Sequence, residues 1–252
     1  MNIEPTWQLA VALVVLVAIA VAMSGVGGLR LGRSLLVAAV RALLQLAAVA
    51  GIVVAAIGHL WSAALFALAM FVIGVWTTTG RTGTRRAWPW VVVAMAAGVL
   101  PVLAVIFGLG VVPLNGAALI PLAGIITGNV MTAHTLTGRR LFDELRSNVP
   151  TYEAGLSIGL LRRDAIAEVT SPRIAEALYP ALDQTRTVGL VTLPGAFIGV
   201  LLGGGTPLQA GAAQVLVLIS VLCAQTITIV VAHLFVRQAR LLPDDLTDRL
   251  RP

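Results

Sequence analysis

Long apolar runs, separated by short polar connectors, make up most of this chain of 252 residues. A helix needs about 20 apolar residues to cross a hydrocarbon layer about 30 Å thick. The connectors contain glycine and proline, which turns require. The pattern therefore predicts an all-α, polytopic integral membrane protein in which 1–252 forms a single transmembrane domain. The seven predicted spans are about 7–29, 34–57, 61–79, 88–110, 115–137, 187–205 and 210–236.

The composition agrees with this class. Hydrophobic residues make up 58% of the chain and charged residues 11%, whereas soluble domains carry about 25% charged residues. The net charge of +6 does not indicate a nucleic-acid partner, because the basic residues lie at the ends of the apolar runs and not along one helix face. We therefore expect a lipid bilayer around most of the surface. We expect no nucleic-acid partner.

The placement of the basic residues, all 17 of them arginine, predicts the orientation. Cytoplasmic loops of membrane proteins are enriched in arginine and lysine. With the N-terminus outside, the inner loops and the C-terminal tail hold every arginine except Arg41, which falls within the second predicted span. We therefore expect an outside N-terminus and a cytoplasmic C-terminus. The exclusive use of arginine is typical of a GC-rich bacterial genome, so the expected location is a bacterial inner (plasma) membrane.

One long polar stretch, residues 138–186, interrupts the apolar pattern. It holds seven of the eleven acidic residues and seven arginines. Thr151 is placed to cap a helix, with Glu153 in the first turn where the helix dipole favours a carboxylate. Apolar residues follow at roughly helical spacing. We expect short amphipathic helices on the cytoplasmic side, whose apolar face requires a partner surface.

The sequence disfavours an enzyme. It contains no lysine and no G-x-x-x-x-G-K-[ST] motif, so a Walker A lysine is impossible and ATP, if used, must bind a separate subunit. The predicted spans hold no Ser/His/Asp set and no paired carboxylates. Cys223 is the single cysteine, which leaves neither a disulfide nor a cysteine metal cluster. We expect no cofactor and no resident metal.

The polar stretch contains the sequence Glu153-Ala154-Gly155-x-x-x-Gly159. It resembles the EAA-x-x-x-G loop of bacterial ABC permeases, in which a helix, a glycine turn and a second helix dock into a cleft on the ATPase. The resemblance implies that Gly159 allows the turn and that Glu153 orients the helix. Leu160 and Leu161 depart from the small or hydroxyl residues expected at the start of the second helix.

Three longer blocks are similar to the signature of FetB-type (YbbM) permeases. They are RALLQL at 41–46, IPLAGIITGNVM at 120–131 and YPALDQTRTVGLVTLPG at 179–195. That family is implicated in bacterial iron export with a partner ATPase, and plant relatives are linked to aluminium tolerance and nucleotide-sugar transport. The resemblance implies an ABC transporter permease, a homodimer with two ATPase subunits, that exports a small molecule or a metal ion such as iron. Residues 138–186 would be its cytoplasmic coupling segment.

Two groups of residues are candidates for function. Within 138–186, Asp183 and Arg186 are three residues apart and face each other on a helix, as a local salt bridge or as a latch for ATPase motion. An ionisable residue inside a span is a functional candidate by default, although small and polar residues also serve helix packing. The docking candidates are Glu153, Ala154, Gly155, Gly159, Asp183 and Arg186, and the pathway candidates are Arg41, Gln45, Asn129, Met131, His134 and Gln225.

The sequence leaves a second transport mechanism open. A stand-alone channel or secondary carrier would use residues 138–186 as a gate. No acidic residue lies in a predicted span, whereas proton- and sodium-coupled carriers usually need an intramembrane carboxylate. This pattern favours ATP coupling through a partner.

Overall fold

The apolar runs form helices, as the pattern predicts. The computed structural model describes residues 6–250, and in that part of the chain all regular elements are helices. The chain separates into two compact units, Met1–Gly58 and His59–Pro252. The all-α, polytopic fold class is confirmed.

The first unit is a helical hairpin of α1 (Trp7–Val26) and α2 (Gly32–Ile57). Gly28 has a φ of 65° in the turn, a conformation that glycine adopts without strain. The backbone N–H of Leu31 donates to Ser24 Oγ at 3.1 Å and closes the turn. Most of the remaining side chains of the two helices are exposed. This unit therefore presents apolar surface on all sides, as a lipid-embedded hairpin does.

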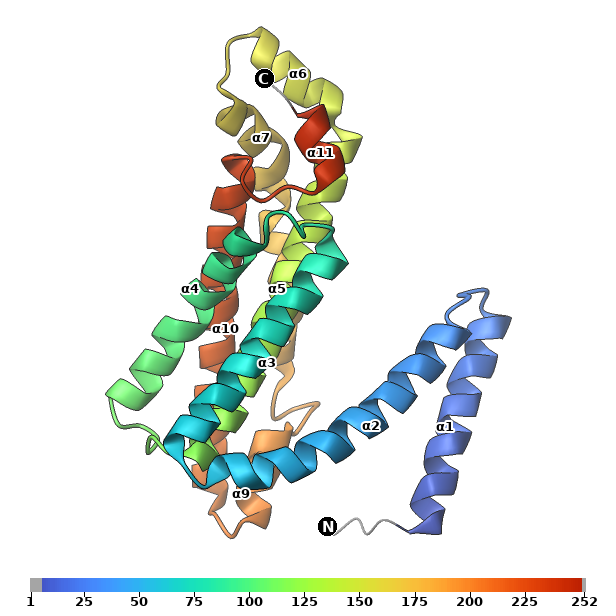
Figure 1. Ribbon diagram of the computed structural model, residues 1–252, viewed down its shortest axis with the longest axis vertical. Coiled ribbons are helices and arrows are strands. Elements are labelled where there is room, and N and C mark those ends of the chain that lie inside the picture. The colour runs from blue at the N-terminus through green and yellow to red at the C-terminus, as the bar shows by residue number, and fades with distance from the viewer. Residues whose placement is uncertain (1–5, 251–252) are drawn as a thin grey trace. The chain divides into compact units, whose positions relative to one another are not determined.

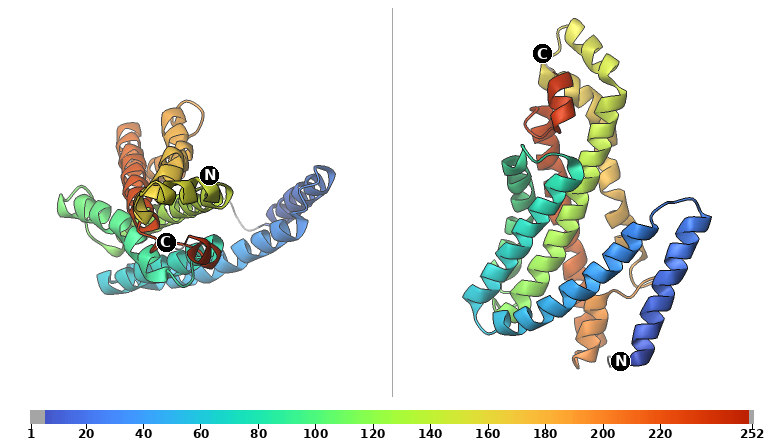
Figure 2. Two further views of the ribbon diagram at one scale, coloured as in Figure 1. Left: turned by 90° about the horizontal axis from the view of Figure 1, so that it is seen from above. Right: turned by 45° about the vertical axis from the view of Figure 1, so that its right-hand side comes forward.

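The second unit is built on four long helices: α3 (Leu60–Thr82), α4 (Trp88–Gly108), α5 (Gly116–Ser147) and α10 (Pro207–Arg237). They lie side by side in Figures 1 and 2. Glycines set the helix spacing, since a Cβ on Gly98 of α4 would lie 2.1 Å from Thr228 Oγ1 of α10, and one on Gly138 of α5 would lie 2.8 Å from Thr82 Cγ2 of α3. Such close backbone approach is how membrane helices gain packing contacts.

Within residues 6–250, six helices are long and apolar enough to span a membrane: α1 to α5 and α10. The structure corrects the predicted span 187–205. Helix α8 (Tyr179–Thr187) ends where this predicted span begins, and residues 188–194 form a turn. Helix α9 (Gly195–Leu202) is too short to cross a bilayer. Gly189 has a φ of 81°, and Pro194 has no N–H and disfavours a helical conformation at the residue before it. These two residues break the apolar run.

Helices α5 and α10 are longer than a hydrocarbon layer is thick. With 32 and 31 residues they are each almost 50 Å long at about 1.5 Å per residue, against a layer of about 30 Å. The predicted fifth span ended at residue 137, but α5 continues to Ser147. Figure 1 shows the remaining short helices α6, α7 and α11 gathered at this end of the second unit. These are α6 (Val149–Ser157), α7 (Arg162–Thr170) and α11 (Asp244–Arg249), and the 3-10 helix η1 (Ser171–Ala177) follows α7.

Candidate functional site

The α6–α7 hairpin contains the predicted glycine turn. Gly159 has a φ of 91°, and a Cβ there would meet nothing within 4 Å. Its N–H donates to Leu156 O at 3.0 Å, and the N–H of Leu160 donates to Gly155 O at 3.0 Å. These two bonds form a Schellman motif that ends α6. The helix–glycine–helix arrangement expected from the sequence is therefore present.

Gly155 lets the two helices of the hairpin pack closely. A Cβ at this buried position would lie 3.2 Å from Leu160 Cδ1 and 3.3 Å from Ala165 Cβ. Leu160 follows the Schellman glycine, the position at which an apolar residue commonly packs back on the helix. This contact explains why a leucine stands at position 160, where the loop sequence of ABC permeases has a small or hydroxyl residue. Leu161 then provides the extended residue before α7.

The outer surface of the hairpin is exposed and partly apolar. Glu153 and Ala154 are exposed, and no ion pair to Glu153 is found in residues 6–250. At the turn, Ile158 is 80% exposed and Leu161 is 59% exposed. Helix α6 begins at Val149 with Pro150 in its first turn, so Thr151 lies inside the helix and is not the cap that the sequence predicts. Proline favours that first-turn position because its missing N–H has no partner there.

The inner surface of the hairpin is anchored to the bundle and to the C-terminal segment. Tyr152 is buried, and its hydroxyl donates to the backbone oxygen of Leu250 at 3.1 Å. On α7, Ile166 and Val169 are buried in the main core. Four leucines of the C-terminal segment are buried in the same core: Leu241, Leu242, Leu246 and Leu250. The hairpin thus has a fixed base and a free outer surface.

Ion pairs between distant residues support this base. Arg173 of η1 contacts Glu176 at 2.8 Å and Glu144 of α5 at 3.4 Å, and Arg140 of α5 also pairs with Glu176. The hydrogen bond from Arg173, followed by the charge of Arg140, lowers the pKa of Glu176. A carboxylate with two such partners is held in its charged form.

A second group of ion pairs holds α11. Arg146 of α5 donates to both carboxylate oxygens of Asp245 at 2.8 and 3.1 Å and lowers its pKa. Arg86, in the α3–α4 loop, lies 3.7 Å from Asp244. This segment was not among the elements predicted from the sequence, although Leu242, Leu246 and Leu250 recur at helical spacing after the last span.

The remaining docking candidates lie on another helix. Asp183 and Arg186 of α8 are both exposed, and Asp183 Oδ1 is 3.6 Å from Arg186 Nη1. They face each other as the spacing predicts. The structure groups Glu153, Ala154, Gly155 and Gly159 in one hairpin and leaves this pair outside it.

The pathway candidates are spread over three helices. Gln225 of α10 donates through Nε2 to the backbone oxygen of Asn129 of α5 at 3.2 Å, while Asn129 Nδ2 donates to Ile125 O at 2.8 Å. Arg41 and Gln45 lie on α2 in the first unit, both exposed. The structure therefore brings Asn129 and Gln225 together, on helices that pack against each other.

His134 is the most enclosed of these candidates. Its side chain is buried, and neither ring nitrogen has a hydrogen-bond partner within residues 6–250. Met131, one turn earlier, is half-buried at the edge of the core. In the same part of the chain no three His, Cys, Asp or Glu side chains gather in a way that could hold a metal ion.

Comparison with known proteins identifies the family. The family model described as "Uncharacterised protein family (UPF0014)" matches residues 6–240. The chain belongs to the UPF0014 family. It is thus a multi-pass membrane protein of the family that includes the FetB-type permeases.

Relatives of this UPF0014 protein occur in plants and bacteria. The UPF0014 membrane protein STAR2 of Oryza sativa subsp. japonica is 34% identical over 225 residues, which cover 86% of this chain and 78% of STAR2. The probable iron export permease protein FetB of Escherichia coli K12 is 31% identical over 140 residues, 56% of this chain and 54% of FetB. The UPF0014 membrane protein YjkA of Bacillus subtilis is 28% identical over 127 residues, about half of each chain. No solved structure matches this chain.

Proposed function

We propose that this UPF0014 protein is the membrane-spanning permease subunit of an ATP-driven transporter, and that a separate ABC ATPase binds the α6–α7 hairpin. One observation carries the proposal: the hairpin has a fixed base in the core and an exposed outer surface with apolar residues at its turn. Such a surface on an end rich in arginine fits a protein partner. ATP-dependent association of two ATPase subunits would then shift the equilibrium of a permease homodimer between two conformations.

The proposed cargo is a metal ion such as iron, moved outward. Support comes from the similarity to FetB, which is described as a probable iron export permease protein. Within the membrane, His134 and Gln225 each carry buried polar atoms without a partner in the described residues. Buried polar atoms without a partner are energetically costly, and their presence is a reason to assign them a function. We place the pathway along α5 and α10, with Asn129 and Met131 beside these two residues.

The docking proposal is tested by co-purification with a candidate ABC ATPase. Replacing the exposed apolar turn residue Ile158 by serine, or Glu153 by alanine together with Gly159 by leucine, should abolish co-purification and ATPase stimulation. Leu190→Ser is the matched control, because Leu190 is 88% exposed but lies in the α8–α9 turn. Unchanged association in the hairpin variants would contradict the docking assignment. Full-rate solute movement by reconstituted permease alone would contradict ATP coupling.

The orientation is tested by labelling a single cysteine. In a Cys223→Ser background, Ser157→Cys places a thiol on the exposed end of α6. A membrane-impermeant maleimide should label it in inverted vesicles and not in intact cells. Labelling in intact cells would place the hairpin outside and exclude contact with a cytoplasmic ATPase. Cellular iron content with and without the permease and its ATPase tests the cargo.

A further inference from the structure

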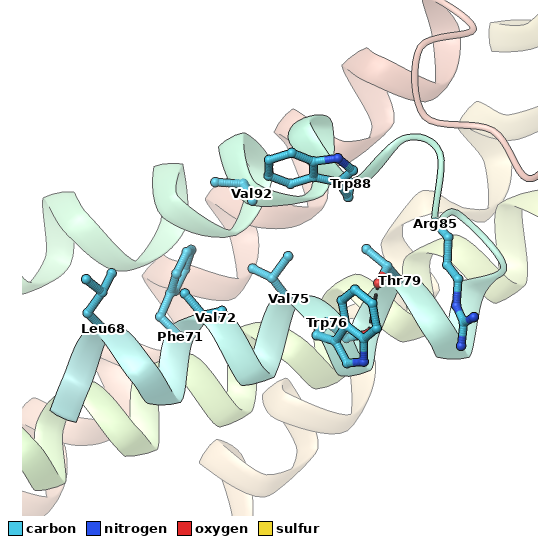
Figure 3. Close-up of a pocket in the computed structure, with 9 residues that line it drawn as sticks. All are labelled: Leu68, Phe71, Val72, Val75, Trp76, Thr79, Arg85, Trp88 and Val92. Atoms are coloured by element: carbon cyan, nitrogen blue, oxygen red, sulfur yellow. Dashed lines mark hydrogen bonds between the residues drawn. The ribbon is translucent and has the colours of Figure 1, made fainter. Parts of the chain in front are cut away.

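A long apolar groove lies between α3 and α4, as Figure 3 shows. Its volume is about 650 Å³. The groove follows α3 from Leu68 to Thr79, three turns or about 16 Å, which is about half the thickness of a hydrocarbon layer. Its lining is apolar apart from one end, and it includes Leu68, Phe71, Val72 and Val75 of α3 and Val92 of α4.

One end of the groove carries a cation and two indoles. The guanidinium of Arg85 lies 5.8 Å from the centroid of the Trp76 ring, and Trp88 lines the same end. Arg85 is exposed and has no ion pair within residues 6–250, whereas its neighbour Arg86 pairs with Asp244. Tryptophan and arginine are the side chains that mark the headgroup level of a bilayer.

We propose that this groove binds an anionic phospholipid of the leaflet on the arginine-rich side. One acyl chain would lie along α3, from Trp76 toward Leu68, and the lipid phosphate would meet Arg85. The length of the groove matches the acyl chain of one leaflet. Arg85, which has no ion pair in residues 6–250, complements a headgroup with net negative charge at the end of the groove. A guanidinium donates in a planar fork that suits phosphate oxygens.

The charge at the groove's end decides the class of lipid. A zwitterionic headgroup places a cation of its own beside the phosphate, whereas an anionic headgroup leaves the phosphate charge for Arg85. One basic residue near an anionic surface contributes about a fivefold preference. This proposal is independent of the cargo and of the ATPase, since it concerns the exposed groove between α3 and α4 and not the hairpin or the proposed pathway.

The charge contribution is tested by native mass spectrometry of the full chain, purified in detergent with equimolar palmitoyl-oleoyl phosphatidylglycerol and phosphatidylcholine. The wild-type protein should retain phosphatidylglycerol about fivefold over phosphatidylcholine. Arg85→Gln should bring the ratio close to one. Arg139→Gln is the control, because Arg139 is exposed on α5, does not line the groove, and has no ion pair in the described chain. Equal retention of both lipids by the wild-type protein, or equal effects of the two variants, would overturn the proposal.

The groove itself is tested with two tryptophan substitutions. Val72 lines the groove and Ile73, its neighbour on α3, does not, and both are more than half exposed. Val72→Trp should fill the groove and reduce the number of phosphatidylglycerol molecules retained, while Ile73→Trp should leave that number unchanged. Thermal melting of both variants checks that they fold. If Val72→Trp folds and retains the lipid at wild-type level, or if cysteine crosslinking at Val72 captures another protein helix, the groove is not the lipid site.

Discussion

The hydroxyl of Tyr152 on α6 donates a hydrogen bond to the backbone oxygen of Leu250, 98 residues later in the chain. The bond joins the base of the proposed docking hairpin to the C-terminal segment. Both residues are buried, so the bond has no competition from water. The hairpin and the segment after the last span therefore form one structural element.

Loss of this hydrogen bond should destabilise the base of the α6–α7 hairpin. Tyr152→Phe leaves the Leu250 oxygen buried without its donor, and we expect a loss of about 1–2 kcal/mol in the free energy of unfolding. Thermal unfolding in detergent measures the loss, and hydrogen exchange should show faster exchange in α6. Tyr179→Phe is the control, because Tyr179 is exposed, and it should change neither quantity. Equal effects of the two substitutions would mean that the bond does not matter.

The turn of the hairpin should require glycine. At Gly159 the φ of 91° is strained for any residue with a Cβ, so Gly159→Ala should cost about 1–2 kcal/mol and weaken ATPase association. Gly195→Ala provides the comparison, since Gly195 also has open space around it but no positive φ. A Gly159→Ala variant as stable as Gly195→Ala would argue against a strained turn.

The contact between α4 and α10 should depend on Gly98. A Cβ there would lie 2.1 Å from Thr228 Oγ1 and 2.4 Å from the backbone oxygen of Ala224, and the backbone cannot move aside without separating the helices. Gly98→Ala should therefore destabilise the protein by about 1–3 kcal/mol. In the same helix, Gly108 has nothing within 4 Å. A melting temperature for Gly98→Ala equal to that of Gly108→Ala would contradict this packing.

The ion pairs at Glu176 should make stability depend on pH in acid. Hydrogen bonding to Arg173 lowers the folded-state pKa of Glu176 below its ordinary 4.5. The stabilisation is therefore present above pH 4.5 and is lost as pH falls through the lower folded-state pKa. Melting curves between pH 7 and pH 3 should show a smaller acid-induced decrease for Glu176→Gln than for the wild-type protein.

The control for this pH dependence is Glu168→Gln. Glu168 is exposed on α7, and no ion pair to it is found in the described residues. Its variant should follow the wild-type curve. If Glu176→Gln shows the full acid-induced decrease, the network does not stabilise the fold.

Much of the candidate docking site could be predicted from local sequence. Gly159 predicts a turn because glycine adopts a positive φ without strain, and Asp183 and Arg186 face each other because helical spacing requires it. The packing of Leu160 on Gly155 could not be predicted, because it depends on the angle at which α7 returns against α6. The same holds for the ion pairs of Glu176, whose partner Arg140 lies 36 residues away.

By itself the sequence determined the class of the protein, the helical spans except 187–205, and the clustering of arginine at the ends of apolar runs. Hydropathy and charge at each position decide whether that position favours lipid or water, so these features can be predicted locally. Only the tertiary structure decided that Tyr152 meets Leu250, that Gly98 lies against Thr228, and that α3 and α4 leave a groove ending at Arg85. These features arise where helices distant in the chain approach, and the approach depends on the packing of all neighbouring side chains at once.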